Sequence, residues 1–295
     1  NWRRWASWPA RQSRERWQGA AMSSDLTIND TEFRQFRDLM RRVAGIELGD
    51  SKKHLVSGRL SKRVRDRGLG SFGEYYRLIA SGNDQEEYHR MVDLLTTHET
   101  YFFREPKHFD YLTGTLLPAL CQRAGGNRLL RFWSAASSTG EEAYSLAMSL
   151  MDNLGDERPW EVVGTDISRD VLAKARRGVY RTERIDGVPP DYLRRYFLRG
   201  IGSRAGTLRV VPEVRVRVQF SEANLNESLA AVGEFDVIFL RNVLIYFDLP
   251  TKREIVERVT RQLRRGGWLF IGHSESLNGV TSALQPVRPT IYQRD

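Results

Sequence analysis

Apolar residues recur every three or four positions through the N-terminal third of the chain, a spacing that predicts amphipathic helices. The first series runs from Phe33 to Val43, can be capped by Asp30 or Thr31, and stops at Gly45. The N-caps that we expect for three further helices are Ser51, Ser71 and Asp84. Four helices with short connections predict a small all-helical domain over residues 22–95.

The pattern changes after this domain, where a connecting segment of residues 96–111 leads into runs of two different periods. Short β-type runs alternate with helical ones, which indicates an α/β fold with a mostly parallel sheet over residues 112–295. We predict strands at 128–134, 160–165, 216–220, 236–240, 267–272 and 290–293, and helices at 109–122, 142–154, 169–177 and 250–264. A glycine-rich turn at 200–206 predicts a small antiparallel β-subdomain inserted at about 196–218.

Residues 1–21 stand apart by composition, with four tryptophans and with five arginines against one glutamate. A basic, aromatic arm of this kind can bind a membrane surface. The segment lacks the apolar core of a signal peptide, and Met22 has the context of a natural start. We therefore expect a disordered or non-native extension that lies outside the fold.

The overall composition limits the class of protein. With 295 residues, 40% of them apolar and 28% charged, the chain can bury one or two ordinary cores. Its apolar runs are too short to span a bilayer, so we expect no integral membrane segment. One cysteine, Cys121, excludes an intramolecular disulfide and favours the reducing cytoplasm. The five histidines show no HExxH pairing, so we expect no metal site.

The formal net charge of +9 suggests a polyanionic partner, which could be nucleic acid, an anionic membrane or an acidic protein. The excess is concentrated in residues 1–21 and in residues 51–68, which hold seven basic residues against one acid. At helical spacing Lys52, Arg59 and Arg63 lie on one stripe with Lys62 beside it, next to an apolar face. Such a stripe fits another helix rich in glutamate, although a run of charges is more often a solvated surface.

Polar residues follow the predicted strands at the edge where open α/β sheets bind ligands. The loop after the first strand ends in Glu141 and Glu142, which would repel a pyrophosphate and attract a cationic ligand. Asp166 follows the second strand, where an acid typically accepts hydrogen bonds from ribose hydroxyls. This order of acids fits S-adenosylmethionine, and the lack of GxGxxG counts against NAD. Taken singly, either acid could instead serve its own helix N-terminus.

Two further strand ends fit the same pocket. Asn224 with Leu225 could contact an adenine, and Arg241, Asn242 and Tyr246 follow the strand predicted at 236–240.

Five sequence segments follow one another along the chain: LTTHETYFFRE (95–105), FWSAASSTGEEAYSLAM (132–148), GTDIS (164–168), RNVLIYFD (241–248) and GGWLFIGHSES (266–276). In this order they resemble the CheR-type chemotaxis receptor glutamate methyltransferases, over residues 31–294. The resemblance implies an all-helical N-terminal domain followed by a Rossmann-like class I methyltransferase domain with a small β-subdomain. It also implies S-adenosylmethionine as the methyl donor and S-adenosylhomocysteine as the product. Nothing in the sequence pattern asks for more than a monomer.

The resemblance also assigns residues. The cofactor contacts that it implies are His98, Thr100, Arg104, Glu141, Asp166, Asn224, Leu225, Arg241 and Asn242. His98 departs from the family, which usually has asparagine there, so this contact could become pH-sensitive. We expect Arg104 to hold the substrate carboxylate and Tyr246 to align it. Without the resemblance, Arg104 could equally pair with Glu105, and Tyr246 could be a core aromatic.

The partner implied is a receptor with glutamate-rich cytoplasmic helices, which would contact Lys52, Arg59, Lys62 and Arg63. In some members of the family the β-subdomain docks a receptor C-terminal peptide, and the glycine-rich turn here is of that type. Two alternatives remain, a nucleic-acid methyltransferase and a non-catalytic S-adenosylmethionine-sensing module that binds a receptor. The first would typically carry an Asn/Asp-Pro-Pro-aromatic turn, whereas the chain reads Asn242-Val-Leu-Ile-Tyr246. The second should lose the functions of Arg104 or Tyr246.

Overall fold

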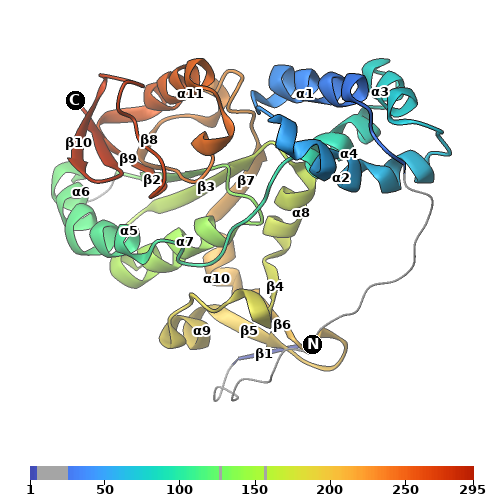
Figure 1. Ribbon diagram of the computed structural model, residues 1–295. Helices are drawn as coiled ribbons and strands as arrows, with labels where there is room; N and C mark the ends of the chain where they lie inside the picture. Colours follow the sequence, from blue (N-terminus) through green and yellow to red (C-terminus); the bar gives the residue numbers. More distant parts are fainter. Residues whose placement is uncertain (5–25, 126–127, 156–157) are drawn as a thin grey trace.

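The computed structural model describes residues 1–4, 26–125, 128–155 and 158–295. A four-helix domain lies at one end of a seven-stranded sheet, and a small second sheet lies at the opposite side of the molecule (Figure 1). The predicted division into an all-helical domain and an α/β domain with a β-subdomain is confirmed.

The helical domain consists of α1 (Asp30–Ala44), α2 (Lys53–Asp66), α3 (Phe72–Ala80) and α4 (Gln85–Leu95). Ser71 and Asp84 cap α3 and α4 as predicted, since their side chains accept backbone N–H groups three residues on. The N-cap of α1 is Asn29, which shares a capping box with Glu32, so the prediction of Asp30 or Thr31 was one or two residues late. Ser51 caps no helix because the short 3₁₀ turn Asp50–Lys52 precedes α2.

The large sheet has the strand order β10-β11-β9-β8-β2-β3-β7. Five neighbouring strands are parallel, and β11 runs antiparallel to both of its neighbours. The strands are β2 (Leu130–Ala135), β3 (Trp160–Asp166), β7 (Val218–Glu222), β8 (Phe235–Leu240), β9 (Leu263–Ile271), β10 (Leu284–Arg288) and β11 (Ile291–Arg294). Strand β10 was not predicted, because LQPVR contains a proline and is mostly exposed, as an edge strand can be.

The central strands β2, β3 and β8 are buried on both faces, and neighbouring residues along each of them face opposite cores. Phe132, Val162 and Phe239 pack in the same core as α7 (Glu141–Leu154) and α6 (Leu117–Ala124). Trp133 and Ile238, their neighbours in sequence, pack in the core that holds α11 (Leu249–Arg261). This two-sided burial explains why the strands read as continuous apolar runs.

The small sheet is larger than predicted. It contains β4 (Val179–Arg181), β5 (Phe197–Gly200) and β6 (Thr207–Val210), with α9 (Pro190–Tyr196) and α10 (Pro212–Arg215) beside it. The insertion therefore begins near Val179, directly after α8 (Arg169–Arg177), and not at about 196. Val218 already belongs to β7 of the large sheet.

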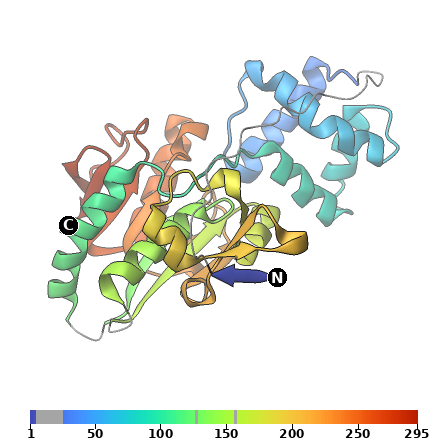
Figure 2. The same ribbon diagram turned by 90° about the horizontal axis from the view of Figure 1, so that it is seen from below.

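A fourth strand of the small sheet comes from the N-terminus. Strand β1 (Trp2–Arg4) pairs antiparallel with β5, and it lies along that edge in both views (Figures 1 and 2). Arg4 forms a 3.0 Å ion pair with Glu213, and the guanidinium of Arg209 lies 5.9 Å from the Trp2 ring. The prediction that residues 1–21 stand outside the fold is thus wrong for Trp2–Arg4, and residues 5–21 lie outside the described ranges.

The helical domain docks on the α/β domain through polar contacts near the end of α1. The backbone N–H of Glu47 donates to the carbonyl of Tyr246 at 3.0 Å, and Arg41 forms a 2.9 Å ion pair with Asp248. The connecting segment ends at Glu105, because α5 (Pro106–Tyr111) begins with a proline in its first turn. A π-helical turn, Leu112–Leu116, then joins α5 to α6. Among the described helices, none combines the length and the apolarity that crossing a membrane requires.

Candidate active site

A cleft opens at the carboxyl ends of β2, β3, β7 and β8, between the sheet and the connecting segment. It holds about 1080 Å³ of space, its open mouth included, which is enough for a nucleoside-sized ligand. The side chains that line it come from the end of α1, from residues 96–104 and from the four strand ends. Eight of the nine predicted cofactor residues line this cleft, namely His98, Thr100, Arg104, Asp166, Asn224, Leu225, Arg241 and Asn242.

Asp166 is fixed at the floor of the cleft by backbone groups. One of its carboxylate oxygens accepts the N–H of Ser138 at 2.9 Å, and the other accepts the N–H of Ser168 at 3.0 Å. Burial raises the pKa of Asp166, and these N–H groups partly oppose that shift. Each carboxylate oxygen keeps a second lone pair, so Asp166 can still accept hydrogen bonds from two neighbouring hydroxyls of a ligand.

Arg241 is fully buried between two carboxylates. Its Nη1 lies 3.1 Å from Glu142 Oε2, and its Nη2 lies 3.0 Å from Glu105 Oε2 and 2.5 Å from the carbonyl of Arg104. Burial raises the pKa of Glu142, while Arg241 opposes that shift. Arg241 therefore orients the acid that faces the cleft and ties the connecting segment to β8.

Among the nine predicted cofactor residues, Glu141 is the one that is not among the residues lining the cleft. Its side chain is completely buried and does not line the cleft, because it accepts the hydroxyl of Thr139 at 2.6 Å and pairs with Arg184 at 3.2 Å. Its neighbour Glu142 lines the cleft instead. The two acids are adjacent in the sequence, and which of them faces the cleft depends on how α7 is rotated, so the pattern alone could not separate them.

Strained backbone marks the same cleft. Ala136, Ser138 and Asn242 have positive φ angles of 62°, 50° and 57°, which non-glycine residues seldom adopt. Asn242 is held by Glu275, whose Oε2 accepts the backbone N–H groups of both Asn242 and Gly272. A Cβ on Gly272 would come within 2.4 Å of the Asn242 amide nitrogen, so only glycine fits there. This strain is a functional signal that the sequence pattern did not show.

Arg104 and Tyr246 both line the cleft, Arg104 from the connecting segment and Tyr246 from the turn after β8. Arg104 donates to the carbonyl of Glu99 at 3.0 Å and lies 5.5 Å from the Tyr101 ring. Its alternative role as the partner of Glu105 is wrong, because Glu105 pairs with Arg241. Tyr246 belongs to the 3₁₀ turn Leu244–Tyr246 after β8, and its side chain lines the cleft as well.

Two further predicted contacts, His98 and Asn224, are hydrogen-bonded to neighbouring parts of the chain. His98 Nε2 lies 2.7 Å from the Thr96 hydroxyl, and its carbonyl accepts the Ser138 hydroxyl at 3.3 Å. Asn224 donates to the carbonyl of Val43 at 2.6 Å, which links the strand end to α1. The amide of Asn224 is therefore partly used in docking the helical domain.

The predicted basic stripe on α2 divides into two kinds of side chain. Arg59 donates to the carbonyls of Leu94 and Thr96, at the end of α4. Arg63 pairs with the buried carboxylate of Glu87. These two arginines stabilise the domain itself, whereas Lys52 and Lys62 are exposed.

The cleft fits a nucleoside that carries positive charge. Asp166 supplies hydroxyl acceptors, Glu142 faces the cavity with a carboxylate, and Ile167, Leu225 and Phe247 provide an apolar wall for a base. A pyrophosphate would meet these acids without a glycine-rich helix N-terminus to hold it. The strand order of the sheet and this set of cleft residues, two carboxylates beside an apolar wall, together define a class I S-adenosylmethionine-dependent methyltransferase.

Comparison with known proteins identifies the family through two domain matches. Residues 31–96 match the CheR methyltransferase all-alpha domain, and residues 98–293 match the CheR methyltransferase SAM-binding domain. Chemotaxis protein methyltransferase 2 of Pseudomonas aeruginosa is 44% identical over 88% of this chain and 92% of that protein. The chemotaxis protein methyltransferase of Escherichia coli is 41% identical over 92% of this chain and 93% of that protein. The chain belongs to the CheR methyltransferase family, and it is an S-adenosylmethionine-dependent methyltransferase of chemotaxis.

Proposed function

We propose that the protein methylates the γ-carboxylates of glutamate side chains on the cytoplasmic helices of chemoreceptors, which gives methyl esters. The observation that carries this proposal is a cleft lined by an arginine and a tyrosine, Arg104 and Tyr246, with no paired general base among its described lining residues. Among the described residues that line it, the histidine His98 is bonded to Thr96, and no Ser–His or His–Asp pair is present.

The chemistry explains why a base is unnecessary. A glutamate has an ordinary pKa of about 4.3, so near pH 7 the acceptor is already ionised. In-line displacement then needs orientation of the carboxylate and removal of its water. When bound, S-adenosylmethionine supplies the methyl group on an activated sulfonium centre.

The chain supplies the orientation. Arg104 uses one N–H to bond Glu99, which leaves further guanidinium donors for a substrate carboxylate. Tyr246 can donate its hydroxyl to the same carboxylate and so fix the direction of attack. The backbone carbonyl of Tyr246 is bonded to Glu47 of the helical domain, so its position depends on domain docking.

The helical domain would recognise the substrate helix. We assign this role to Lys52 and Lys62, since Arg59 and Arg63 are already bonded within the domain. Exposed ammonium groups attract a glutamate-rich surface with little cost in desolvation. The protein would work as a monomer in the cytoplasm, where Cys121 stays reduced.

The β-subdomain would hold a receptor C-terminal peptide by strand addition. Support comes from β5, whose outer edge accepts an extended strand and already pairs with Trp2–Arg4. A receptor peptide at this edge would have to displace β1.

The decisive experiment is transfer of labelled methyl from S-adenosylmethionine to receptor-containing membranes. We expect label that is released by mild alkali and that is lost when the receptor glutamates are replaced by alanine. Alkali-stable label would exclude an ester. Label on DNA or RNA without receptor would favour a nucleic-acid methyltransferase, and binding without transfer would favour a non-catalytic module.

A further inference from the structure

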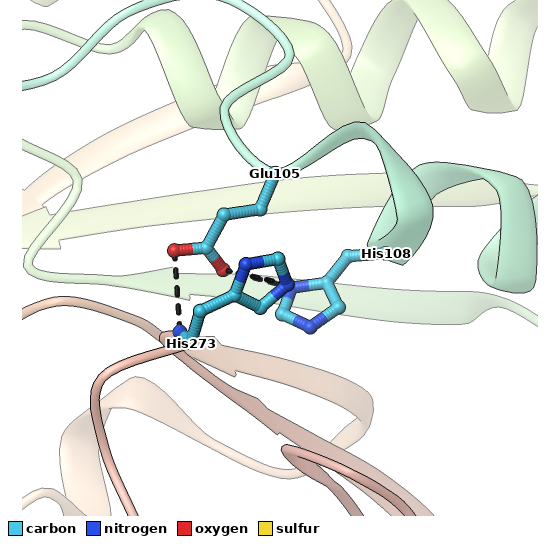
Figure 3. Close-up of side chains that lie close together, drawn as sticks. All are labelled: Glu105, His108 and His273. Atoms are coloured by element: carbon cyan, nitrogen blue, oxygen red, sulfur yellow. Dashed lines mark hydrogen bonds and ion pairs between the residues drawn. The ribbon is translucent and has the colours of Figure 1, made fainter.

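Beside the cleft, Glu105, His108 and His273 bring three metal-binding atoms together (Figure 3). Glu105 precedes α5, His108 lies in its first turn, and His273 follows β9, so no short sequence motif contains all three. Glu105 Oε2 lies 3.4 Å from His108 Nδ1 and 3.8 Å from His273 Nε2. Bonds of about 2.0 Å to a tetrahedral zinc ion place neighbouring ligands about 3.3 Å apart.

The tautomer of His108 follows from its neighbours. The Thr290 hydroxyl donates to the carbonyl of Pro289 at 2.6 Å, which favours the tautomer of His108 in which Nε2–H donates to Thr290 Oγ1 at 2.8 Å. His108 Nδ1 therefore carries a lone pair, and that lone pair faces the Glu105 carboxylate.

Two acceptors thus meet without a donor between them. His108 is 2% exposed, and neither its Nδ1 nor Glu105 Oε2 has a hydrogen-bond partner among the described residues. Arg241 Nη2 forms a 3.0 Å ion pair with Oε2, whereas Nδ1 of His108 has no hydrogen-bond donor among the described residues. A cation between Oε2 and Nδ1 would satisfy both atoms.

The charge and the surroundings agree with a divalent ion. Among the described residues, the hydrogen-bonded network beside the cluster holds the carboxylates of Glu105, Glu142 and Glu275. Two guanidinium groups act on these acids, that of Arg241 through ion pairs and that of Arg104 through its charge near Glu142. The bond from His108 Nε2 to Thr290 is the outer contact that orients a ligating imidazole. His273 is half exposed, with 52% of its side chain accessible, which leaves room for a water as the fourth ligand.

We propose that Glu105, His108 and His273 bind one zinc-class divalent ion at the edge of the active-site cleft. Two imidazoles and one carboxylate select Zn²⁺ or Co²⁺ over Mg²⁺ and Ca²⁺, which prefer oxygen ligands. Bound metal would tie the connecting segment to the end of β9, next to Arg241 and Asn242 of the cleft.

The test is a Co²⁺ titration of the full chain without a histidine tag or cofactor, followed by displacement with Zn²⁺. We expect one equivalent to bind with the visible absorption of four-coordinate cobalt, and excess Mg²⁺ should leave that absorption unchanged. His273→Ala removes an exposed ligand, so it should keep the wild-type unfolding midpoint and bind at least about tenfold more weakly. His54→Ala changes an exposed histidine outside the cluster and should bind as the wild type does.

Three outcomes would overturn the proposal. They are the absence of stoichiometric binding, equal binding by His273→Ala, and a sulfur-to-cobalt band that moves the ion to Cys121. Methyl transfer plays no part in these readouts, so a failed metal site leaves the proposed function untouched.

Discussion

Cofactor binding should depend most directly on the carboxylate group of Asp166. Asp166→Asn keeps the shape but replaces one acceptor oxygen with an NH₂ group that faces a backbone N–H. We expect S-adenosylmethionine to bind at least about tenfold more weakly, because hydrogen bonds to a charged group contribute about 1.5–3 kcal/mol. Calorimetric titration measures this loss. Asp170→Asn in the first turn of α8, a partly exposed carboxylate that pairs with Lys174 and does not line the cleft, is the matched control. Equal losses in both variants would contradict the assignment.

A single hydroxyl distinguishes the two roles open to Tyr246. Tyr246→Phe retains the ring, so a purely packing role predicts unchanged kinetics. If the hydroxyl aligns the acceptor carboxylate, kcat should fall about tenfold or more while the dissociation constant of S-adenosylmethionine stays the same. Single-turnover transfer to receptor membranes separates these cases, with Tyr88→Phe in α4 as the control. An unchanged kcat would leave the orienting role to Arg104.

At the scale of elements, one buried carboxylate connects three helices of the small domain. Glu87 of α4 accepts hydrogen bonds from Tyr75 of α3 at 2.7 Å, from Arg63 of α2 at 2.9 Å and from Arg67 at 3.0 Å. Burial raises the pKa of Glu87, but these partners outweigh it and lower the pKa to about 2. The ionised form therefore stabilises the folded domain.

This shift makes stability depend on pH in a defined direction. Because the folded pKa lies below the unfolded one, the stabilisation is complete above about pH 4.5 and is lost as the pH falls towards 2. Its upper size is about 3 kcal/mol. Urea unfolding should show Glu87→Gln less stable than wild type near pH 6, with a clearly smaller difference near pH 3. A constant difference would mean that Glu87 acts by packing alone.

The exposed lysines of α2 should affect the receptor and not the cofactor. Lys52→Ala with Lys62→Ala removes two charges from the surface assigned to the glutamate-rich helix. We expect kcat/KM for receptor to fall about tenfold at low salt, with a smaller loss at high salt because exposed charges are screened. Cofactor affinity should not change. Arg177→Ala with Arg265→Ala removes two exposed charges elsewhere, and an equal loss there would indicate a general charge effect.

The sequence predicted elements better than it predicted side-chain partners. Period-three-and-four and period-two patterns located all four N-terminal helices and the five parallel strands, because each is buried in a regular way. The sequence pattern did not predict the edge strand β10, because its side chains are mostly exposed and show no regular burial. In the sequence Arg59 and Arg63 look like solvated charges, because their hydrogen-bond partners, the end of α4 and Glu87, lie more than twenty residues away along the chain. Likewise, no local pattern joins Glu105 to Arg241.

At the scale of the whole molecule, β1 and a receptor peptide should compete for one edge. A chain that begins at Leu26 lacks β1, so we expect it to bind a receptor C-terminal peptide more tightly than the full chain does. Fluorescence anisotropy of a labelled peptide measures the difference. The variant Arg4→Ala of the 295-residue chain, which loses the ion pair to Glu213, should lie between the two. Equal affinities would show that the peptide binds elsewhere or that β1 does not cover the edge in solution.

Strand β1 also covers backbone groups that would otherwise be unpaired. Without it, the outer N–H and C=O groups of β5 from Leu198 to Gly200 form an open edge, and an open edge can pair with any other extended chain. Two truncated molecules could join their sheets edge to edge. Removal of β1 should therefore make the protein associate with itself as its concentration rises. In the chain that keeps β1, this strand covers the edge of β5 and so protects the protein from aggregation.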